Sequence, residues 1–296
     1  MTAALRGYIR RSGASGWLGL MIVGTVTLAA LLAPIIAPHD PVSIDLAVSL
    51  EGPGHTYLLG TDQAGRDILS RLIWGARVSL QVGVLAVAVG LLLGLAMGLV
   101  SAFYSGTIIE QAIMRTVDAL ASIPLLIWAI ALVGILGVKP IDLGFIEVPN
   151  EFKLIVMIGV LYAPNLARVT YAVALGESQS DYVKARRVQG ASDAAIIFGD
   201  ILPNCLSPVV VQATLLIAAG IIIEASLSFI GLGVQPPQPS WGGMLSDARS
   251  YLYSGEWWLF VFPGIAISLT VIGFNLLGDA LRDALDPRRQ TANVVG

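Results

Sequence analysis

Asp181–Asn204, DYVKARRVQGASDAAIIFGDILPN, is a polar interruption between two long apolar runs. The pattern predicts two helical segments joined by a turn. The first continues the preceding helix and ends at Gly190, because glycine takes the left-handed conformation at little steric cost. The second begins with an N-cap at Ser192 or Asp193. We expect Pro203 to limit its length, because proline cannot donate a hydrogen bond within a helix.

The overall composition places the chain in a membrane. Of its 296 residues, 56% are hydrophobic and only 12% are charged, and the mean hydropathy is +0.80. Such a chain is too apolar for a soluble globular domain. Nothing in the composition indicates nucleic-acid binding. The single cysteine, Cys205, excludes an internal disulfide bond.

Six apolar runs are long enough to cross a bilayer, which takes about 20 helical residues. They predict one all-α membrane domain over residues 17–278, between cytosolic tails at 1–16 and 279–296. The first run is interpreted as an uncleaved span, because it exceeds the usual apolar region of a signal peptide. The expected spans are residues 17–37, 78–103, 119–138, 154–175, 206–231 and 257–277.

The distribution of lysine and arginine predicts the orientation. An even number of spans puts both termini on one side of the membrane. If that side is the cytosol, 11 of the 17 Lys and Arg residues lie in cytosolic segments and the other 6 in outer loops, as the positive-inside rule favours. The prediction is therefore a multi-pass protein with both termini and the turn at 181–204 in the cytosol.

The sequence argues against several kinds of active site. A P-loop needs a lysine between a glycine and a serine or threonine, and none of the chain's lysines, Lys139, Lys153 and Lys184, stands in that context. Both histidines, His39 and His55, fall in the first outer loop, away from any nucleophile within the spans. His, Cys, Asp and Glu form no cluster with metal-site spacing. We therefore expect neither catalysis nor a bound metal or cofactor.

The polar turn resembles the EAA loop of permease subunits in type I ABC importers. That pattern is Glu-Ala-Ala, three residues, Gly, nine residues, then Ile-x-Leu-Pro. Four residues match it at the right spacing: Ala185, Gly190, Leu202 and Pro203. Three depart from it, Lys184, Arg186 and Asp200, where the pattern has Glu, Ala and Ile. The resemblance implies a coupling loop at 181–204 that docks into a groove of a separate ATPase subunit, with contacts from Lys184, Ala185, Arg186, Gly190, Ala191, Leu202 and Pro203.

Three further stretches are similar to the C-type permease subunit of the dipeptide and oligopeptide branch of that family. They are GTDQAGRDILSRLIWGARVSL at 60–80, EASLSFIGLGVQPPQPSWGGML at 224–245 and NLLGDALRDALDPR at 275–288. The resemblance implies a six-span permease in the bacterial inner membrane, in contact with the lipid bilayer. It also implies three kinds of partner: a homologous second permease, two ATPase subunits that carry ATP and Mg²⁺, and an extracytoplasmic substrate-binding protein.

Residues 60–77 predict an amphipathic helix on the outer side of the membrane. Thr61 or Asp62 is expected to cap it, and it is expected to lie along the membrane surface. Its role is either a structural elbow that orients the second span or a contact for the binding protein. The candidate outer residues are Asp62 and Arg66, Asp67 and Arg71, each an acid-first pair four residues apart, together with Trp241.

Glu224 is the acidic residue that clearly falls within a span, where charge is costly. Two interpretations stay open. Either it faces the translocation path and meets the amino terminus of a peptide, or it is protonated and hydrogen-bonded between helices. The loop at 231–243, which follows this span, holds three prolines and predicts a rigid outer turn.

These observations predict a permease subunit that forms half of the path of an ABC importer for dipeptides or short oligopeptides. The same architecture importing nickel chelates or another small solute is the first alternative. A self-sufficient channel or secondary carrier is the second, and its mark is several acidic or His residues within the spans. A membrane enzyme is the third, and the absence of a paired nucleophile and base counts against it.

Overall fold

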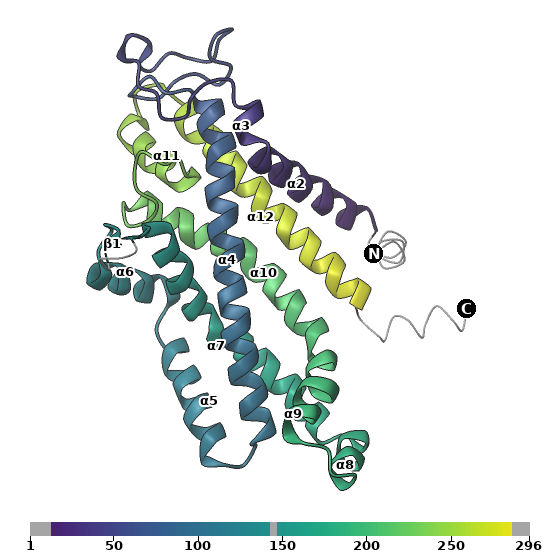
Figure 1. The fold of residues 1–296 in the computed structure, drawn as a ribbon. Helices are drawn as coiled ribbons and strands as arrows, with labels where there is room; N and C mark the ends of the chain where they lie inside the picture. Colours follow the sequence, from purple (N-terminus) through teal and green to yellow (C-terminus); the bar gives the residue numbers. More distant parts are fainter. Residues whose placement is uncertain (1–12, 143–146, 286–296) are drawn as a thin grey trace.

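The computed structural model describes residues 13–142 and 147–285, and these ranges are mostly helical (Figure 1). Five helical segments are long and apolar enough to span a membrane: α2 (Gly13–Leu31), α4 (Ile68–Phe103), α7 (Asn150–Ser178), the continuous segment Asp193–Phe229 that ends in α10 (Leu202–Phe229), and α12 (Trp258–Leu285). A sixth candidate is the bent pair α5 (Ile108–Ala121) and α6 (Leu125–Leu136). The all-α membrane fold is therefore confirmed. Most of the two predicted tails, residues 1–12 and 286–296, lies outside the described residues.

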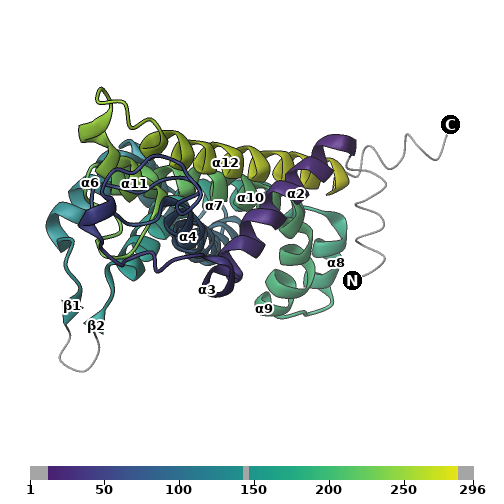
Figure 2. The same cartoon turned by 90° about the horizontal axis from the view of Figure 1, so that it is seen from above.

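α4 is the long central helix on which other helices pack. In Figure 1 it runs from the end that holds α3 (Ala33–Ile36) and α11 (Trp241–Ala248) to the opposite end, near α8 (Asp181–Val188) and α9 (Asp193–Ala195). Its largest interface is with α7, and it also packs on α10 and α2. α2 lies along α12 in both views (Figures 1 and 2). The chain thus forms one helical layer around a single long helix.

Small residues bring α4 and α7 together. Gly90, Gly94 and Gly98 recur every four residues of α4 and so share one face. A Cβ atom at Gly94 would lie 2.5 Å from the Leu166 Cβ, and one at Gly98 would lie 2.5 Å from the Thr170 Cβ. The two backbones therefore approach too closely for any side chain at these positions. Such small-residue stripes are typical of helix packing in membranes, where dispersion contacts replace the hydrophobic effect.

The third span differs from the expected straight run over 119–138. Its helix breaks between Ala121 and Leu125, and α5 and α6 meet at 89°. Pro124 explains the break, because it disfavours helical geometry at the preceding residue and has no backbone N–H to donate. The following helix starts directly after this proline.

The second span also differs, because its helix begins ten residues before the expected start. α4 starts at Ile68, with Asp67 as its N-cap: the Asp67 carboxylate accepts a hydrogen bond of 2.9 Å from the Ser70 backbone N–H. The separate surface helix predicted over 60–77 does not form, and neither Thr61 nor Asp62 caps a helix. Asp62 instead accepts hydrogen bonds from the backbone of Ala64 and Arg66 and shapes the preceding loop.

Several short elements complete the described chain. α11 was not predicted, and its N-cap Ser240 accepts a hydrogen bond of 3.1 Å from the Gly243 N–H. The two-residue strands β1 (Ile141–Asp142) and β2 (Glu147–Val148) pair antiparallel. Short helical turns lie at η1 (Leu46–Val48) and η3 (Arg249–Tyr251). α12 continues without a break past residue 278, where the domain was expected to end.

Candidate functional site

The polar turn at 181–204 forms a helical hairpin that projects from one end of the molecule (Figure 1). α8 ends as predicted at Gly190, whose φ of +78° lies in the left-handed region. The Gly190 N–H donates to the Arg187 carbonyl at 3.0 Å, and the Ala191 N–H donates to the Arg186 carbonyl at 3.1 Å. This pair of bonds is a Schellman motif, the helix end that favours glycine.

The two flanks of the hairpin differ from the prediction. α8 is a separate helix, because α7 ends at Ser178 and a short turn precedes Asp181. Ser192, one of the two expected candidates, caps α9 and accepts a hydrogen bond of 3.3 Å from the Ala195 N–H. Pro203 does not end this helix, since a π-helical segment, η2 (Ile196–Ile201), leads directly into α10. Pro203 lies in the first turn of α10, where a missing N–H is tolerated.

The hairpin is fixed to the membrane helices by a small apolar cluster. Val183 of α8 is fully buried against Ile196, Ile201 and Cys205. The Arg187 guanidinium lies over the Phe103 ring at the end of α4, 5.1 Å from its centroid, a geometry in which the cation is attracted to the ring face. The hairpin is therefore a folded extension of the helical domain.

The predicted coupling residues lie mainly on the outside of this hairpin. Lys184, Ala185, Arg186, Gly190 and Pro203 are exposed, and Ala191 and Leu202 are half-buried. Two apolar side chains that the sequence did not single out, Val188 and Phe198, are 89% and 66% exposed. Large exposed apolar side chains beside small residues are typical of a protein contact surface.

Tyr182 ties the start of α8 to its neighbours. Its hydroxyl donates to the Glu177 carboxylate at 2.6 Å and accepts from the Asn204 amide at 2.9 Å. Partial burial, followed by the hydrogen bond to Glu177, raises the pKa of the Tyr182 hydroxyl. The hydroxyl thus keeps its proton, and this hydrogen bond, at neutral pH.

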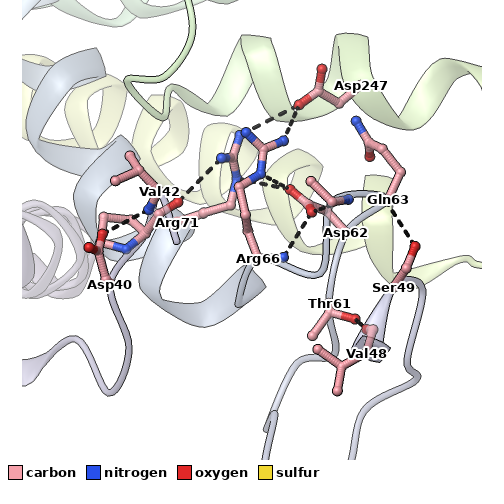
Figure 3. A network of polar contacts seen from close by, with 12 residues as sticks. Asp40, Val42, Val48, Ser49, Thr61, Asp62, Gln63, Arg66, Arg71 and Asp247 are labelled. Carbon is pink, nitrogen blue, oxygen red and sulfur yellow. Dashed lines mark hydrogen bonds and ion pairs between the residues drawn. The ribbon is translucent and has the colours of Figure 1, made fainter. Parts of the chain in front are cut away.

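A cluster of two arginines and two aspartates lies at the other end of the molecule (Figure 3). Arg66 Nε lies 2.7 Å from Asp62 Oδ2, and its Nη2 lies 3.2 Å from Asp247 Oδ2. Arg71 Nε lies 3.4 Å from Asp62 Oδ2, and its Nη2 lies 3.5 Å from Asp247 Oδ2. Asp62, Arg66, Arg71 and Asp247 are called the outer charge cluster after the side that the sequence predicts for them. The cluster joins the loop before α4, α4 itself and α11, and its formal charges balance.

The expected pair of Asp67 and Arg71 does not form. The Asp67 carboxylate caps α4 and lies 3.4 Å from His39 Nδ1, while Arg71 turns to the outer charge cluster. Asp62, Asp67 and Arg71 are all buried. Their interactions within the chain favour the structural interpretation of these outer residues over a contact for a binding protein.

Trp241, like these residues, is buried and makes its contacts within the chain. It is 2% exposed, and its indole N–H donates to the Leu72 carbonyl of α4 at 3.0 Å. A Cβ atom at Gly75 would lie 3.1 Å from the Trp241 ring. Trp241 therefore fastens α11 to α4, next to the outer charge cluster.

Removing one acid from the outer charge cluster will destabilise the fold. Asp62→Ala leaves the buried Arg71 with less compensation, and losing one partner of a buried ion pair costs about 3 kcal/mol. We expect the thermal unfolding midpoint of the purified protein in detergent to fall by roughly 5–10 °C. Asp40→Ala, at an exposed residue of the same outer loop, is the control. Equal midpoints for the two variants would contradict the structural role of the cluster.

Glu224 is fully buried between α10 and α4. The Ser79 hydroxyl of α4 donates to its Oε2 at 2.9 Å, and the Ser228 hydroxyl donates to its Oε1 at 2.7 Å. Both carboxyl oxygens are thus engaged inside this chain. The geometry favours the interpretation of Glu224 as an interhelical hydrogen-bonding group over a direct contact with substrate.

Substitution of Glu224 separates these two interpretations. Glu224→Gln keeps an oxygen acceptor and polar partners for both serines, so we expect transport to stay within about twofold of wild type. Glu224→Leu leaves two buried hydroxyls without their acceptor, at about 1–3 kcal/mol each, and should lower the unfolding midpoint. If Glu224 instead contacts substrate, Glu224→Gln will raise the KM for transport about tenfold or more without changing the midpoint.

Several structural residues had not been identified from the sequence. Asp247 lies 181 positions from Arg66 in the chain, and no local spacing reveals that pairing. Ser79 is an ordinary small residue of an apolar run until α10 places Glu224 beside it. The α4 glycines did carry a signal, a spacing of four residues on one helix face.

Comparisons with known proteins agree with this geometry. Residues 90–291 match the family described as the binding-protein-dependent transport system inner membrane component. The chain is 40% identical over 291 residues to the di/tripeptide transport system permease protein DppC of Pseudomonas aeruginosa, covering 96% of this chain and 91% of that protein. It is 42% identical over 276 residues to the dipeptide transport system permease protein DppC of Escherichia coli, covering 91% and 88%.

A solved structure has a similar fold. A chain of the inward-facing MetNI methionine ABC transporter superposes with a TM-score of 0.55 at 21% identity, covering 73% of this chain and 96% of that chain. At this identity the likeness concerns the fold alone.

The apolar spanning helices and the family match together identify a multi-pass permease subunit of the ABC importer class. The chain belongs to the family of binding-protein-dependent transport system inner membrane components. It is accordingly a protein of the bacterial inner membrane.

Proposed function

We propose that this chain is one of two homologous permease subunits of an importer for dipeptides or short oligopeptides, with the substrate path between the two. The similarity to dipeptide permeases carries this proposal, because it extends over about nine-tenths of the chain at 40% and 42% identity. The helices α4, α7 and α10 pack closely on one another. They supply the helical scaffold that one half of a membrane path needs.

In this proposal the hairpin at 181–204 faces the cytosol. The outer charge cluster faces the opposite side, where the substrate-binding protein is. The distribution of Lys and Arg in the sequence supports that orientation, with both termini in the cytosol. Two ATPase subunits dock on hairpins of the two permeases and carry ATP and Mg²⁺. This chain then binds no nucleotide and catalyses no reaction. An extracytoplasmic binding protein delivers the substrate.

The hairpin transmits the ATPase movement to the spans. Binding of ATP closes the ATPase subunits and displaces α8, and η2 passes the displacement directly to α10. A rigid-body change of this kind switches access from one side of the membrane to the other. The exposed Val188 and Phe198 supply apolar contact area for the docking.

Uptake of a labelled dipeptide in cells that carry or lack this chain tests the proposed substrate. We expect uptake to require the chain, to be competed by unlabelled dipeptides and to be unaffected by a nickel chelate. Competition by the nickel chelate but not by dipeptides would assign the chain to the alternative substrate. Uptake that persists when the partner ATPase is inactivated would contradict an ATP-driven importer.

A further inference from the structure

Two of the residues that depart from the EAA pattern lie in contact. Arg186 stands where the pattern has alanine, and Asp200 stands where it has isoleucine. In the structure the Arg186 Nε donates to the Asp200 Oδ2 at 3.1 Å, across 14 residues of sequence. If only one of these two positions were charged, its side chain would lack this ion-pair partner.

This ion pair closes the hairpin on itself. Arg186 lies in the last turn of α8, where its carbonyl also accepts the Schellman hydrogen bond from Ala191. Asp200 lies in η2, the π-helical segment that continues into α10. π-helical segments often occur at functional sites, where the register of a helix is adjusted. The pair therefore connects the end of α8 to the segment that leads into a membrane span.

A second connection lies one helical turn away. Tyr182 precedes Arg186 by four residues, so the two side chains share a face of α8. The Asn204 amide donates to the Tyr182 hydroxyl at 2.9 Å and to the Asp200 carbonyl at 3.0 Å. On another side of α8, Val183 is buried against η2 and the start of α10. Three contacts thus hold α8 against η2 and the start of α10: the Arg186 ion pair, the Tyr182 hydrogen bond and the buried Val183.

Apart from Arg186, the exposed residues that we propose for docking take no part in these connections. Val188, Phe198 and Ala185 are exposed. Lys184 pairs with Asp181 of the same helix at 3.2 Å, so that ion pair does not connect α8 to α10. Among the described ion pairs of the hairpin, the contact of Arg186 with Asp200 is the one that bridges its two arms.

We propose that Arg186 and Asp200 are positioning residues that fix α8 relative to α10, so that movement of a docked partner passes to the span. Their side chains are 45% and 19% exposed, and ion pairs of such exposure contribute little to overall stability. Loss of the pair should therefore lower the efficiency of coupling while the protein stays folded. The inference rests on the proposed coupling function and adds to it the residues that carry the movement.

The test uses the complete importer, purified with its partner subunits and reconstituted in proteoliposomes with its binding protein and labelled alanyl-alanine as the probe. The readout is the number of dipeptides transported per ATP hydrolysed. We expect Arg186→Ala and Asp200→Ala each to lower this ratio about three- to tenfold and the double variant to lower it no further, as in a coupled pair. The exchange R186D/D200R should restore at least about half of the wild-type ratio.

Asp118→Asn is the matched control. It removes an exposed ion pair of 2.8 Å with Arg168, between α5 and α7, and should leave the ratio unchanged. Wild-type ratios for both single variants, or an exchange variant as impaired as the singles, would overturn the positioning role. Failure of the proposed function gives a different result, because the wild-type complex would then show no dipeptide-stimulated ATP hydrolysis at all.

Discussion

Gly94→Leu will prevent this protein from folding. A Cβ atom at Gly94 would lie 2.5 Å from the Leu166 Cβ, 3.0 Å from the Ala167 N and 3.1 Å from the Ala163 O. Two of these atoms belong to the α7 backbone, which cannot move aside as a flexible side chain can. Overpacking usually costs about 1–3 kcal/mol, and separating the largest helix interface of the molecule should exceed that range.

The measurement is the yield of monodisperse protein after extraction in mild detergent, followed by size-exclusion chromatography. We expect Gly94→Leu to give no monodisperse peak. Gly24→Leu is the control, because no atom lies within 4 Å of a Cβ at Gly24, and leucine has the higher helix propensity by about 0.8 kcal/mol. A Gly94→Leu peak equal to that of the control would contradict the close approach of α4 and α7.

Gly190→Leu will abolish coupled transport while leaving the permease inserted in the membrane. No atom lies within 4 Å of a Cβ at Gly190, so a leucine there projects from the hairpin and creates no clash inside the chain. On the proposed docking surface it should hold this chain and the ATPase subunit apart. We expect dipeptide-stimulated ATP hydrolysis in reconstituted vesicles to fall about tenfold or more, the effect of losing about 1.4 kcal/mol of contact.

Backbone strain is the other route by which Gly190→Leu could act. Gly190 has a φ of +78°, and a side chain in the left-handed region costs about 1–2 kcal/mol. Gly190→Ala carries nearly the same strain with little bulk, whereas Gly190→Asn carries bulk with less strain. We expect the asparagine variant to lose coupling and the alanine variant to retain most of it. Normal stimulation of ATP hydrolysis by Gly190→Leu would contradict the docking assignment.

The sequence predicted the features that local physics determines. The length of the apolar runs identified the spanning helices, because a bilayer of fixed thickness requires a minimum number of helical residues. Gly190 predicted the end of α8, because the Schellman motif favours a residue without a Cβ. Of the two predicted N-cap candidates, Ser192 and Asp193, Ser192 is the one that caps α9.

Two differences could have been anticipated from the sequence. Pro124 interrupts the third apolar run and marks the bend between α5 and α6. Asp67 comes directly before an apolar run and has Ser70 three residues later, the pattern of an N-cap with a nearby donor. The hydropathy of the third run outweighed the first signal. The second was outweighed by the acid-first pairs, which predicted a helix capped earlier, at Thr61 or Asp62.

The remaining differences depend on tertiary structure. Asp247 joins Arg66 and Arg71 because α11 folds back onto α4, and no local pattern encodes that contact. Pro203 does not end the second helix of the hairpin, because that helix continues through η2 into α10 and the proline lies in the first turn of α10. Glu224 was left with two interpretations because burial depends on which helix lies opposite, and that helix brings Ser79.

The most direct test of the account is to identify what binds this chain in its native membrane. The chain is tagged, extracted in mild detergent and purified, and the associated proteins are identified by mass spectrometry. We predict recovery of a second multi-span permease together with an ATPase that contains a P-loop. With the Gly190→Leu variant, we predict that the second permease is still recovered and the ATPase is not. Recovery of the chain alone, or only with copies of itself, under conditions that keep other membrane complexes intact would contradict the assignment as a coupled permease subunit.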